Sequence, residues 1–134
     1  MSTTVQTNLD TVRAFIERFW NEGDLDCADQ FLAEDYTELS YQSKEGLKQF
    51  AAKLLEAFPD KLYTVEHIIG EGDIVLVRMN VKGKHGGMFF GRAATGNEID
   101  VTLYRRYRVA DGKITEHRGW IDMATMWHQL NKTD

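Results

Sequence analysis

The chain has 134 residues, with 16 Lys and Arg against 21 Asp and Glu for a net charge of −5, and 43% of its residues are hydrophobic. This length and composition fit one globular domain over residues 1–134, and they exclude a disordered chain or one of low complexity. Because the chain is acidic, we do not expect it to bind nucleic acid. No apolar run approaches the roughly 20 residues of a membrane helix, so no membrane association is expected either. The single cysteine and the absence of a signal-peptide pattern predict a cytoplasmic protein.

The first predicted helix follows from an apolar stripe near the N-terminus. Apolar residues recur there at spacings of three and four, which places them on one side of a helix. They are Leu9, Val12, Phe15, Ile16 and Phe19. Thr7 or Asn8 is suited to cap the start of this helix, and Gly23 is suited to end it in a left-handed conformation.

Two further helices are expected before residue 60. Asp24 is placed to cap a short helix with Cys27 off its apolar side, so we expect a partly exposed, inert thiol. Residues 35–39 form a short extended segment. Ser43 then opens a third helix, which Pro59 ends because proline disfavours a helical conformation in the residue before it.

The remaining sequence predicts an antiparallel sheet. Residues 62–69 and 74–83 are two strands joined by a turn, and the apolar odd-numbered side of the second strand must face the core. Residues 99–109 and 114–122 form a hairpin around Asp111-Gly112, a strong turn signal. A last helix follows. The chain is therefore expected to be an α+β domain with helices against one face of the sheet.

The closing hairpin contains the main candidate chemistry. With a two-residue turn, Val109 pairs with Ile114, and the side of the hairpin that holds more large apolar groups is assigned to the core. Four charged residues share this inward side, which is tolerated only if they are paired or line a wet pocket. They are Arg105, Glu116, Arg118 and Asp122.

Two interpretations of this charged cluster remain open. In the first, Arg118 and Asp122 form a structural ion pair that closes the sheet onto the helices. In the second, Asp122 is an acid/base in a pocket and Arg118 stabilises negative charge. His85 continues the inward odd-numbered series and is aimed at the same space, although a histidine on such a face is often only part of the core.

Aromatic and aliphatic residues are available to surround a ligand in such a pocket. The candidate substrate-binding residues are Trp20, Tyr36, Phe50, Leu54, Phe89, Arg105 and Trp120. The four histidines are scattered without the spacing of a metal site, so no metal is expected. No phosphate-binding loop and no nucleophile elbow are present.

Several short motifs, in order along the chain, resemble the SnoaL-like polyketide cyclases of the NTF2-like superfamily. They are Phe19-Trp20-Asn21-Glu22-Gly23-Asp24, Phe58-Pro59-Asp60, Gly83-Lys84-His85-Gly86-Gly87, Ala94-Thr95-Gly96, the stretch 107–114, and Glu116-His117-Arg118-Gly119-Trp120-Ile121-Asp122. The resemblance extends from about residue 9 to residue 130.

This resemblance implies a cone in which N-terminal helices pack on a strongly bent antiparallel sheet and enclose a pocket. It implies that Asp122 is the carboxylate used as general acid/base, and that His85 is the histidine of a glycine-rich motif. It further implies a small hydrophobic carbonyl ligand, no cofactor and a homodimer. The sequence departs from the family pattern at Arg118, where cyclases commonly carry an aromatic residue.

Three functional hypotheses follow. The first is a cofactor-independent cyclase or isomerase acting on a polyketide-like carbonyl compound. The second is a module that binds a small molecule without turnover. The third is an interaction domain that docks a partner on the outer face of the sheet, although Arg106, Arg108 and His117 are expected to make that face polar.

Overall fold

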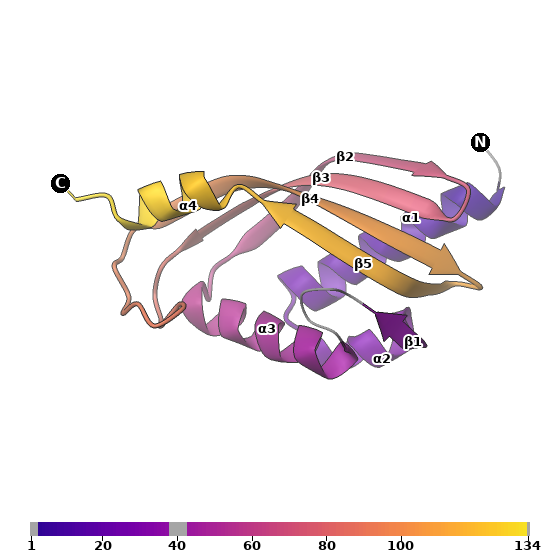
Figure 1. Ribbon diagram of the computed structural model, residues 1–134, viewed down its shortest axis with the longest axis horizontal. Coiled ribbons are helices and arrows are strands. Elements are labelled where there is room, and N and C mark those ends of the chain that lie inside the picture. The colour runs from indigo at the N-terminus through magenta and orange to yellow at the C-terminus, as the bar shows by residue number, and fades with distance from the viewer. Residues whose placement is uncertain (1–2, 38–42, 134) are drawn as a thin grey trace.

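The structure is a computed structural model that describes residues 3–37 and 43–133 (Figure 1). Its helical elements are α1 (Thr3–Phe15), the π-helical turn η1 (Ile16–Asn21), the 3₁₀ turn η2 (Leu25–Cys27), α2 (Ala28–Phe31), α3 (Lys44–Ala57) and α4 (Met123–Leu130). Its strands are β1 (Leu32–Thr37), β2 (Leu62–Glu71), β3 (Ile74–Lys84), β4 (Glu98–Ala110) and β5 (Lys113–Ile121).

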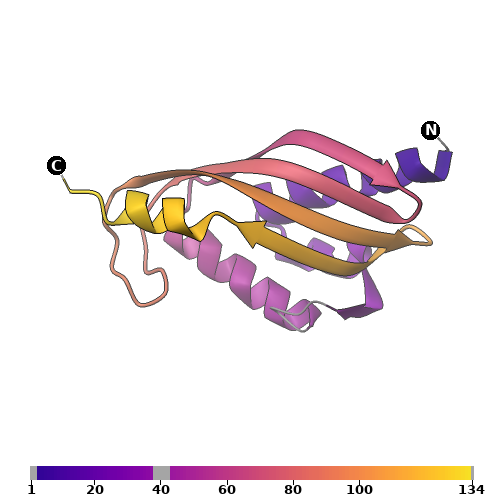
Figure 2. The same ribbon diagram turned by 45° about the horizontal axis from the view of Figure 1, so that its top comes forward.

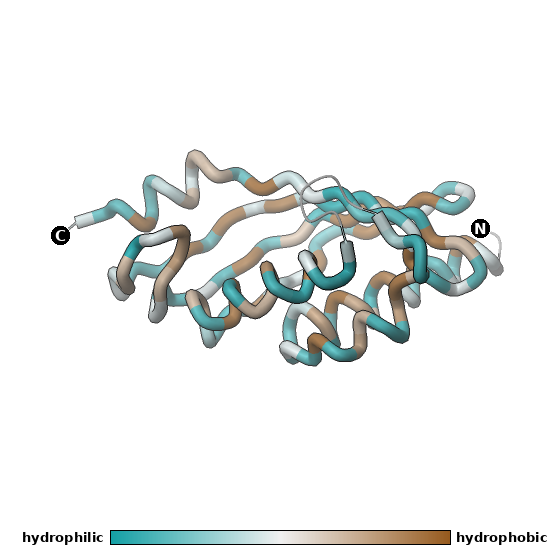
Figure 3. The backbone as a smooth tube through the Cα atoms, turned by 60° about the horizontal axis from the view of Figure 1, so that its bottom comes forward, coloured by the Kyte–Doolittle hydropathy of each residue, from teal (hydrophilic) through white to brown (hydrophobic). Residues whose placement is uncertain are grey.

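The five strands form one curved open sheet in the order β1-β5-β4-β3-β2, confirming the predicted α+β class. The strands β2 to β5 pair antiparallel, and the short β1 runs parallel to β5 at one edge. The sheet arches over α1 and α3, so both helices lie against its concave face (Figures 1 and 2). Hydrophobic and hydrophilic residues alternate along the strands and helices (Figure 3), and the buried apolar residues of both layers form one core cluster. Among the described residues, no helix is long and apolar enough to cross a membrane.

The predicted first helix is confirmed, but it begins earlier than expected. All five residues of its apolar stripe are buried. Thr7 and Asn8 do not cap its start, because α1 already runs from residue 3 and no helix-breaking residue precedes them. After η1, Gly23 has a φ of +73° and ends the helical segment in the left-handed conformation, as predicted.

The next two helices agree with prediction except at Asp24 and Cys27. Asp24 stands at the N-cap position of η2, but its side chain makes no capping hydrogen bond, because its carboxylate accepts from Arg18 at 3.1 Å. Ser43 accepts a hydrogen bond from the backbone N–H of Gly46, 3.1 Å away, and α3 ends two residues before Pro59. Cys27 is buried rather than partly exposed, because η2 winds more tightly than an α-helix and turns its thiol inward. Burial raises the pKa of this thiol.

The concave face of the sheet is lined as the alternation predicts along β3 and β4. Val75, Val77, Met79 and Val81 are all buried. The opposite residues on β4 extend the same surface, from Ile99 at one end to Val109 at the other. These two strands therefore supply the floor of the core.

The hairpin between β4 and β5 differs from the predicted register after the two pairs of residues next to the turn. Asp111 and Gly112 both have positive φ and form the expected two-residue turn, and Val109 pairs with Ile114. A bulge then leaves Thr115 unpaired, so that Arg108 lies opposite Glu116.

The bulge reverses the orientation of every later residue in β5. His117 faces inward and is buried, whereas Glu116, Arg118 and Trp120 lie on the other side. The predicted inward orientation of Glu116, Arg118 and Asp122 is therefore wrong. Arg108 donates instead to Glu116 at 2.9 Å and to Asp73 at 2.7 Å in a partly exposed network.

The glycine-rich segment between β3 and β4 crosses the C-terminal end of α3. The backbone N–H groups of Gly86 and Gly87 both donate to the carbonyl of Ala57. A Cβ atom on Gly87 would lie 2.2 Å from the carbonyl oxygen of Glu56, so only glycine allows this close approach. The segment is thereby fixed beside the helix that it crosses.

Candidate functional site

The candidate site is a pocket of about 320 Å³ between α3, the sheet, the 86–97 segment and the start of α4. Its described lining is predominantly apolar, as in most small-molecule sites. The lining residues are Phe50, Leu54, Phe58, Lys61, Tyr63, Val81, Phe89, Phe90, Ile99, Leu103, Arg105, Gly119, Trp120, Ile121, Met123 and Met126. Five of the predicted substrate-binding residues are among them: Phe50, Leu54, Phe89, Arg105 and Trp120.

Arg105 brings a guanidinium group to the inner end of the pocket. The side chain projects from the concave face of β4 and is 5% exposed. Its Cζ lies 3.9 Å from the centre of the Trp20 ring and 5.5 Å from that of Tyr63, so two aromatic faces hold the cation in place. An arginine remains charged even when buried, so this end of an otherwise apolar pocket is electropositive.

Behind Arg105, His117 connects the pocket to the aromatic core. Its ring stacks on Tyr107 with centroids 4.9 Å apart, and its Nδ1 lies 3.1 Å from the Tyr36 hydroxyl. Nε2 lies 3.5 Å from Nη1 of Arg105, which can only donate, so the neutral ring carries its proton on Nδ1. Burial, reinforced by Arg105, holds the pKa of His117 well below its usual value.

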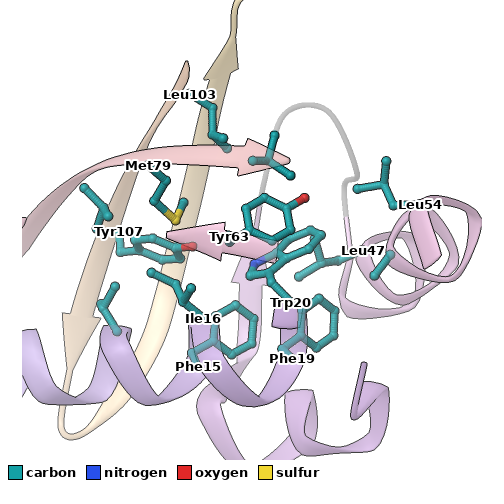
Figure 4. Close-up of a cluster of buried hydrophobic side chains, with 14 of the residues drawn as sticks. Phe15, Ile16, Phe19, Trp20, Leu47, Leu54, Tyr63, Met79, Leu103 and Tyr107 are labelled. Atoms are coloured by element: carbon teal, nitrogen blue, oxygen red, sulfur yellow. The ribbon is translucent and has the colours of Figure 1, made fainter. Parts of the chain in front are cut away.

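Two predicted pocket residues, Trp20 and Tyr36, lie one layer deeper than expected. Both are buried and neither is among the lining residues. Trp20 supports Arg105, and its ring centre is 5.7 Å from that of Tyr63 (Figure 4). Tyr36 contacts the site through His117. The predicted extended segment containing Tyr36 is β1 as far as Thr37, and residues 38 and 39 lie outside the described residues.

His85 is buried beside the pocket and does not line it. Its ring packs at 5.5 Å from Phe58 and 6.4 Å from Phe89, measured between centroids, and both phenylalanines face the pocket. Nδ1 accepts from the backbone N–H of Thr95 at 3.3 Å and lies 3.0 Å from its hydroxyl. Through these contacts His85 fixes the loop that carries the pocket wall.

Asp122 is exposed and caps α4. Its carboxylate accepts from the backbone N–H of Thr125 at 3.0 Å and from the Thr125 hydroxyl at 2.6 Å. These hydrogen bonds lower the pKa of Asp122, because they favour the ionised form. The carboxylate is occupied in a cap and is not one of the groups lining the pocket. Its catalytic role stays a prediction.

Arg118 and Trp120 share the outer side of β5. The Cζ of Arg118 lies 5.4 Å from the centre of the Trp120 ring, and Arg118 is cross-strand neighbour to Arg106. No ion pair joins Arg118 to Asp122 among the described residues. Trp120 is half exposed at the border of the pocket.

Sequence reasoning missed Lys61 and His117. Lys61 is 8% exposed and enters the pocket just before β2, and its Nζ donates to the backbone carbonyl of Trp20 at 2.5 Å. Nothing in the hydropathy pattern marks a lysine that follows a helix-ending proline as buried. His117 could have been found by counting charges, because a one-residue bulge removes three charged residues from the core face and leaves His117, Gly119 and Ile121 there.

Metal ligation finds no support in the described part of the chain. No group of three His, Cys, Asp or Glu side chains is arranged there to hold a metal ion. The ionisable groups among the described lining residues are Lys61, Tyr63 and Arg105. This set suits the binding of a carbonyl or enolate oxygen.

A family model and two sequence relatives agree on the family that this chain resembles. The family model of SnoaL-like polyketide cyclases matches residues 10–130. The chain is 29% identical over 136 residues to the aklanonic acid methyl ester cyclase DnrD of Streptomyces peucetius, covering 96% of this chain and 93% of that protein. It is 30% identical over 132 residues to the corresponding cyclase DauD of Streptomyces sp. strain C5, covering 92% and 81%.

A solved structure of a SnoaL-like protein has the same fold as this chain. The crystal structure of a SnoaL-like protein from Jannaschia sp. CCS1 superposes with a TM-score of 0.91 at 25% identity, covering 100% of this chain and 98% of that one. The curved sheet, the helices on its concave face and the family match over residues 10–130 together show that the chain belongs to the SnoaL-like polyketide cyclase family of the NTF2-like fold.

Proposed function

We propose that this protein is a cofactor-independent cyclase or isomerase acting on a small, largely apolar carbonyl compound. The observation that carries the proposal is the buried guanidinium of Arg105 at the inner end of an apolar pocket. A ketone bound with its oxygen toward Arg105 would have its carbonyl polarised, and the enolate formed by loss of the neighbouring proton would be stabilised.

Positioning of Arg105 supports this role. Ring closure by an intramolecular aldol reaction and isomerisation of an unsaturated ketone both pass through an enolate, so both need a preorganised cation at the oxygen. Trp20 and Tyr63 hold the guanidinium by its faces, and the neutral His117 behind it adds no competing positive charge. The cation is therefore in place before a ligand arrives.

The relatives suggest the first compound to test. Because the curated relatives are aklanonic acid methyl ester cyclases, aklanonic acid methyl ester is a direct probe of ring closure. Exchange of α-protons in D₂O, followed by NMR on a simple cyclic ketone, reports enolate formation separately from ring closure. Both measurements are needed, since an isomerase would catalyse exchange without closing this ring.

The decisive variants are neighbours on one strand. Arg105→Gln removes the cation from the pocket, and we expect enolate exchange to fall by ~10²-fold or more. Arg106→Gln is the matched control, because Arg106 lies on the opposite face of β4, where it pairs with Glu116 at 3.8 Å. Saturable ligand binding with no exchange and no ring closure in the wild type would instead support a binding module without turnover.

The proposal includes a homodimer formed through the outer face of the sheet. Tyr104 and Trp120 are about half exposed on neighbouring strands there, with Arg106 and Arg118 beside them. His117, expected on this face from the sequence, faces inward. A mixed aromatic and polar surface of this kind suits a two-fold contact. Light scattering should give twice the chain mass of 15.4 kDa, and a mass of one chain would contradict this part of the proposal.

A further inference from the structure

Lys61 is an unusual lysine in its surroundings. Lysines are almost never buried unless they are paired, yet this residue is only 8% exposed and lines the apolar pocket. Its Nζ donates to the Trp20 carbonyl of η1 and lies 5.6 Å from the centre of the Tyr63 ring on β2. A backbone carbonyl can accept from an amine as well as, more strongly, from an ammonium, so this contact does not require the charged form.

The charged group nearest to Lys61 in the described pocket is another cation. Arg105 faces it from β4, with the neutral His117 behind, and no carboxylate lies within 4.0 Å of Nζ among the described residues. Burial, with a smaller effect from Arg105, lowers the pKa of Lys61. A desolvated lysine beside a second cation is the arrangement that turns an ammonium into a nucleophilic amine.

We propose that Lys61 is a nucleophile that forms a Schiff base with the carbonyl group of a ligand in this pocket. The inference rests on the proposed function in one respect, that the ligand is a carbonyl compound. The lone pair of Nζ attacks the carbonyl carbon and a C–N bond forms as the C–O π bond breaks. The oxygen takes one proton from the amine nitrogen and one from solvent, the remaining C–O bond breaks, and the oxygen leaves as water. The product is an iminium ion, and no oxidant or reductant is consumed.

The iminium would activate the carbon next to the former carbonyl group. Its positive nitrogen withdraws electrons, so a proton on the carbon next to the iminium carbon is lost more easily to water and an enamine forms. The enamine carbon can attack a second carbonyl of the same ligand and close a ring, and the oxygen of that carbonyl takes a proton back from solvent. Water then hydrolyses the iminium and restores Lys61. Arg105, which also lines the pocket, would polarise the oxygen during the first attack.

The test uses pentane-2,4-dione, a small diketone that converts a reactive lysine amine into a stable enaminone. The adduct adds the mass of the diketone less one water, and peptide mapping locates it. At neutral pH we expect Lys61 to be labelled several-fold faster than the exposed Lys84, because a larger fraction of its amine is uncharged. Labelling that follows exposure, with Lys84 modified and Lys61 unmodified, would overturn the proposal.

Two variants complete the test. Lys61→Arg keeps a long basic side chain but cannot form the enaminone, so it should lose the fast-labelling site, whereas Lys84→Arg should keep it. Peptide mapping of the wild-type protein decides the outcome even if Lys61→Arg does not fold. If Lys61 is not labelled while α-proton exchange depends on Arg105, the inference fails and the proposed function stands. If Lys61 is labelled but no exchange or ring closure occurs, the proposed function fails and the nucleophile stands.

Discussion

The two ends of strand β4 face very different environments beneath the same sheet. Toward its C-terminal end, Tyr107 and Val109 are buried under α1, where Phe15 and Phe19 stack with centroids 4.8 Å apart. Toward its N-terminal end, Ile99 and Leu103 line the pocket under α3 and α4. Aromatic side chains from η1 and α1 fill the first space, whereas the second contains the pocket.

Arg105 stands at the boundary between these two regions. On one side its guanidinium packs on Trp20 and approaches His117, and on the other it borders the pocket. The comparison shows how a small domain can keep a cation away from solvent. The aromatic end supplies a rigid support, and the apolar end supplies a space of low dielectric constant in which, under the proposed function, the charge acts on a ligand.

Truncation of one aromatic residue at each end should produce the largest difference in stability. Phe15→Ala opens a cavity in the packed end and should lower the free energy of unfolding by about 3–5 kcal/mol. Phe50→Ala removes a half-buried side chain that already borders the pocket, so we expect a loss of about 1–2 kcal/mol. Urea unfolding measures both. Equal losses would mean that the pocket end is packed as tightly as the aromatic end.

Two adjacent glycines, Gly86 and Gly87, test whether the loop that forms one pocket wall is held against α3. A methyl group at position 87 would collide with the backbone of α3, so Gly87→Ala should cost about 2 kcal/mol or more and loosen ligand binding. Gly86→Ala is the control, since its nearest contact would be an ordinary 3.5 Å to Pro59. Thermal melts together with ligand titration separate the two effects. A Gly87→Ala protein as stable as Gly86→Ala would show that the loop is not held against α3.

Because His117, between the two ends of β4, is buried in its neutral form, we expect the free energy of unfolding to fall in acid. Its pKa lies well below 6.5 when folded, whereas an unfolded histidine titrates near 6.5. Below pH 6.5 the unfolded chain therefore binds more protons, and the free energy of unfolding falls as pH drops, by at most about 1.4 kcal/mol per pH unit.

The pH effect can be assigned with two variants. His117→Gln should flatten the fall in stability between pH 6.5 and pH 5, whereas His128→Gln, an exposed residue at the end of α4, should leave it unchanged. Melting curves across this range provide the measurement. An unaltered slope in His117→Gln would mean that another group is responsible for the acid sensitivity.

The smallest effect is expected at Asp122, which lies outside both regions. Asn is as good an N-cap as Asp, so Asp122→Asn should leave the melting temperature almost unchanged, while Asp122→Ala should lower it by roughly a few degrees. A large fall in the Asn variant would point instead to a buried ion pair, which was one of the two hypotheses drawn from the sequence.

Much of the fold could be predicted from the sequence, because alternation along β3 and β4 and the Asp111-Gly112 turn are local signals. The error at β5 came from one residue. Thr115 bulges out of the ladder, and the face assigned from large apolar groups near the turn was carried across it. Three charges on the inward side argue against that register, since the bulge moves Glu116 and Arg118 to the outer side and Asp122 is exposed.

Site residues could be predicted where their position depends on which face of a strand or helix they occupy. They could not be predicted where it depends on how deeply they are buried. Arg105 was assigned to the inward side of β4 and lines the pocket, as do Phe50, Leu54 and Phe89. Trp20 lies one layer too deep, and the burial of Lys61 depends on long-range contact with η1. Sequence periodicity identifies a face, but it does not give the depth of a residue below that face.

Under the proposed function, the charge that acts on the ligand is Arg105, at the boundary between the two regions. Its contribution is best compared with that of Asp122, the carboxylate that the family resemblance favours. The rate of α-proton exchange on one ketone should be measured for Arg105→Gln and Asp122→Asn under the same conditions. We predict a loss of ~10²-fold or more in Arg105→Gln and less than about threefold in Asp122→Asn. Exchange that survives in Arg105→Gln and disappears in a folded Asp122→Asn protein would contradict the claim and place the chemistry at the start of α4.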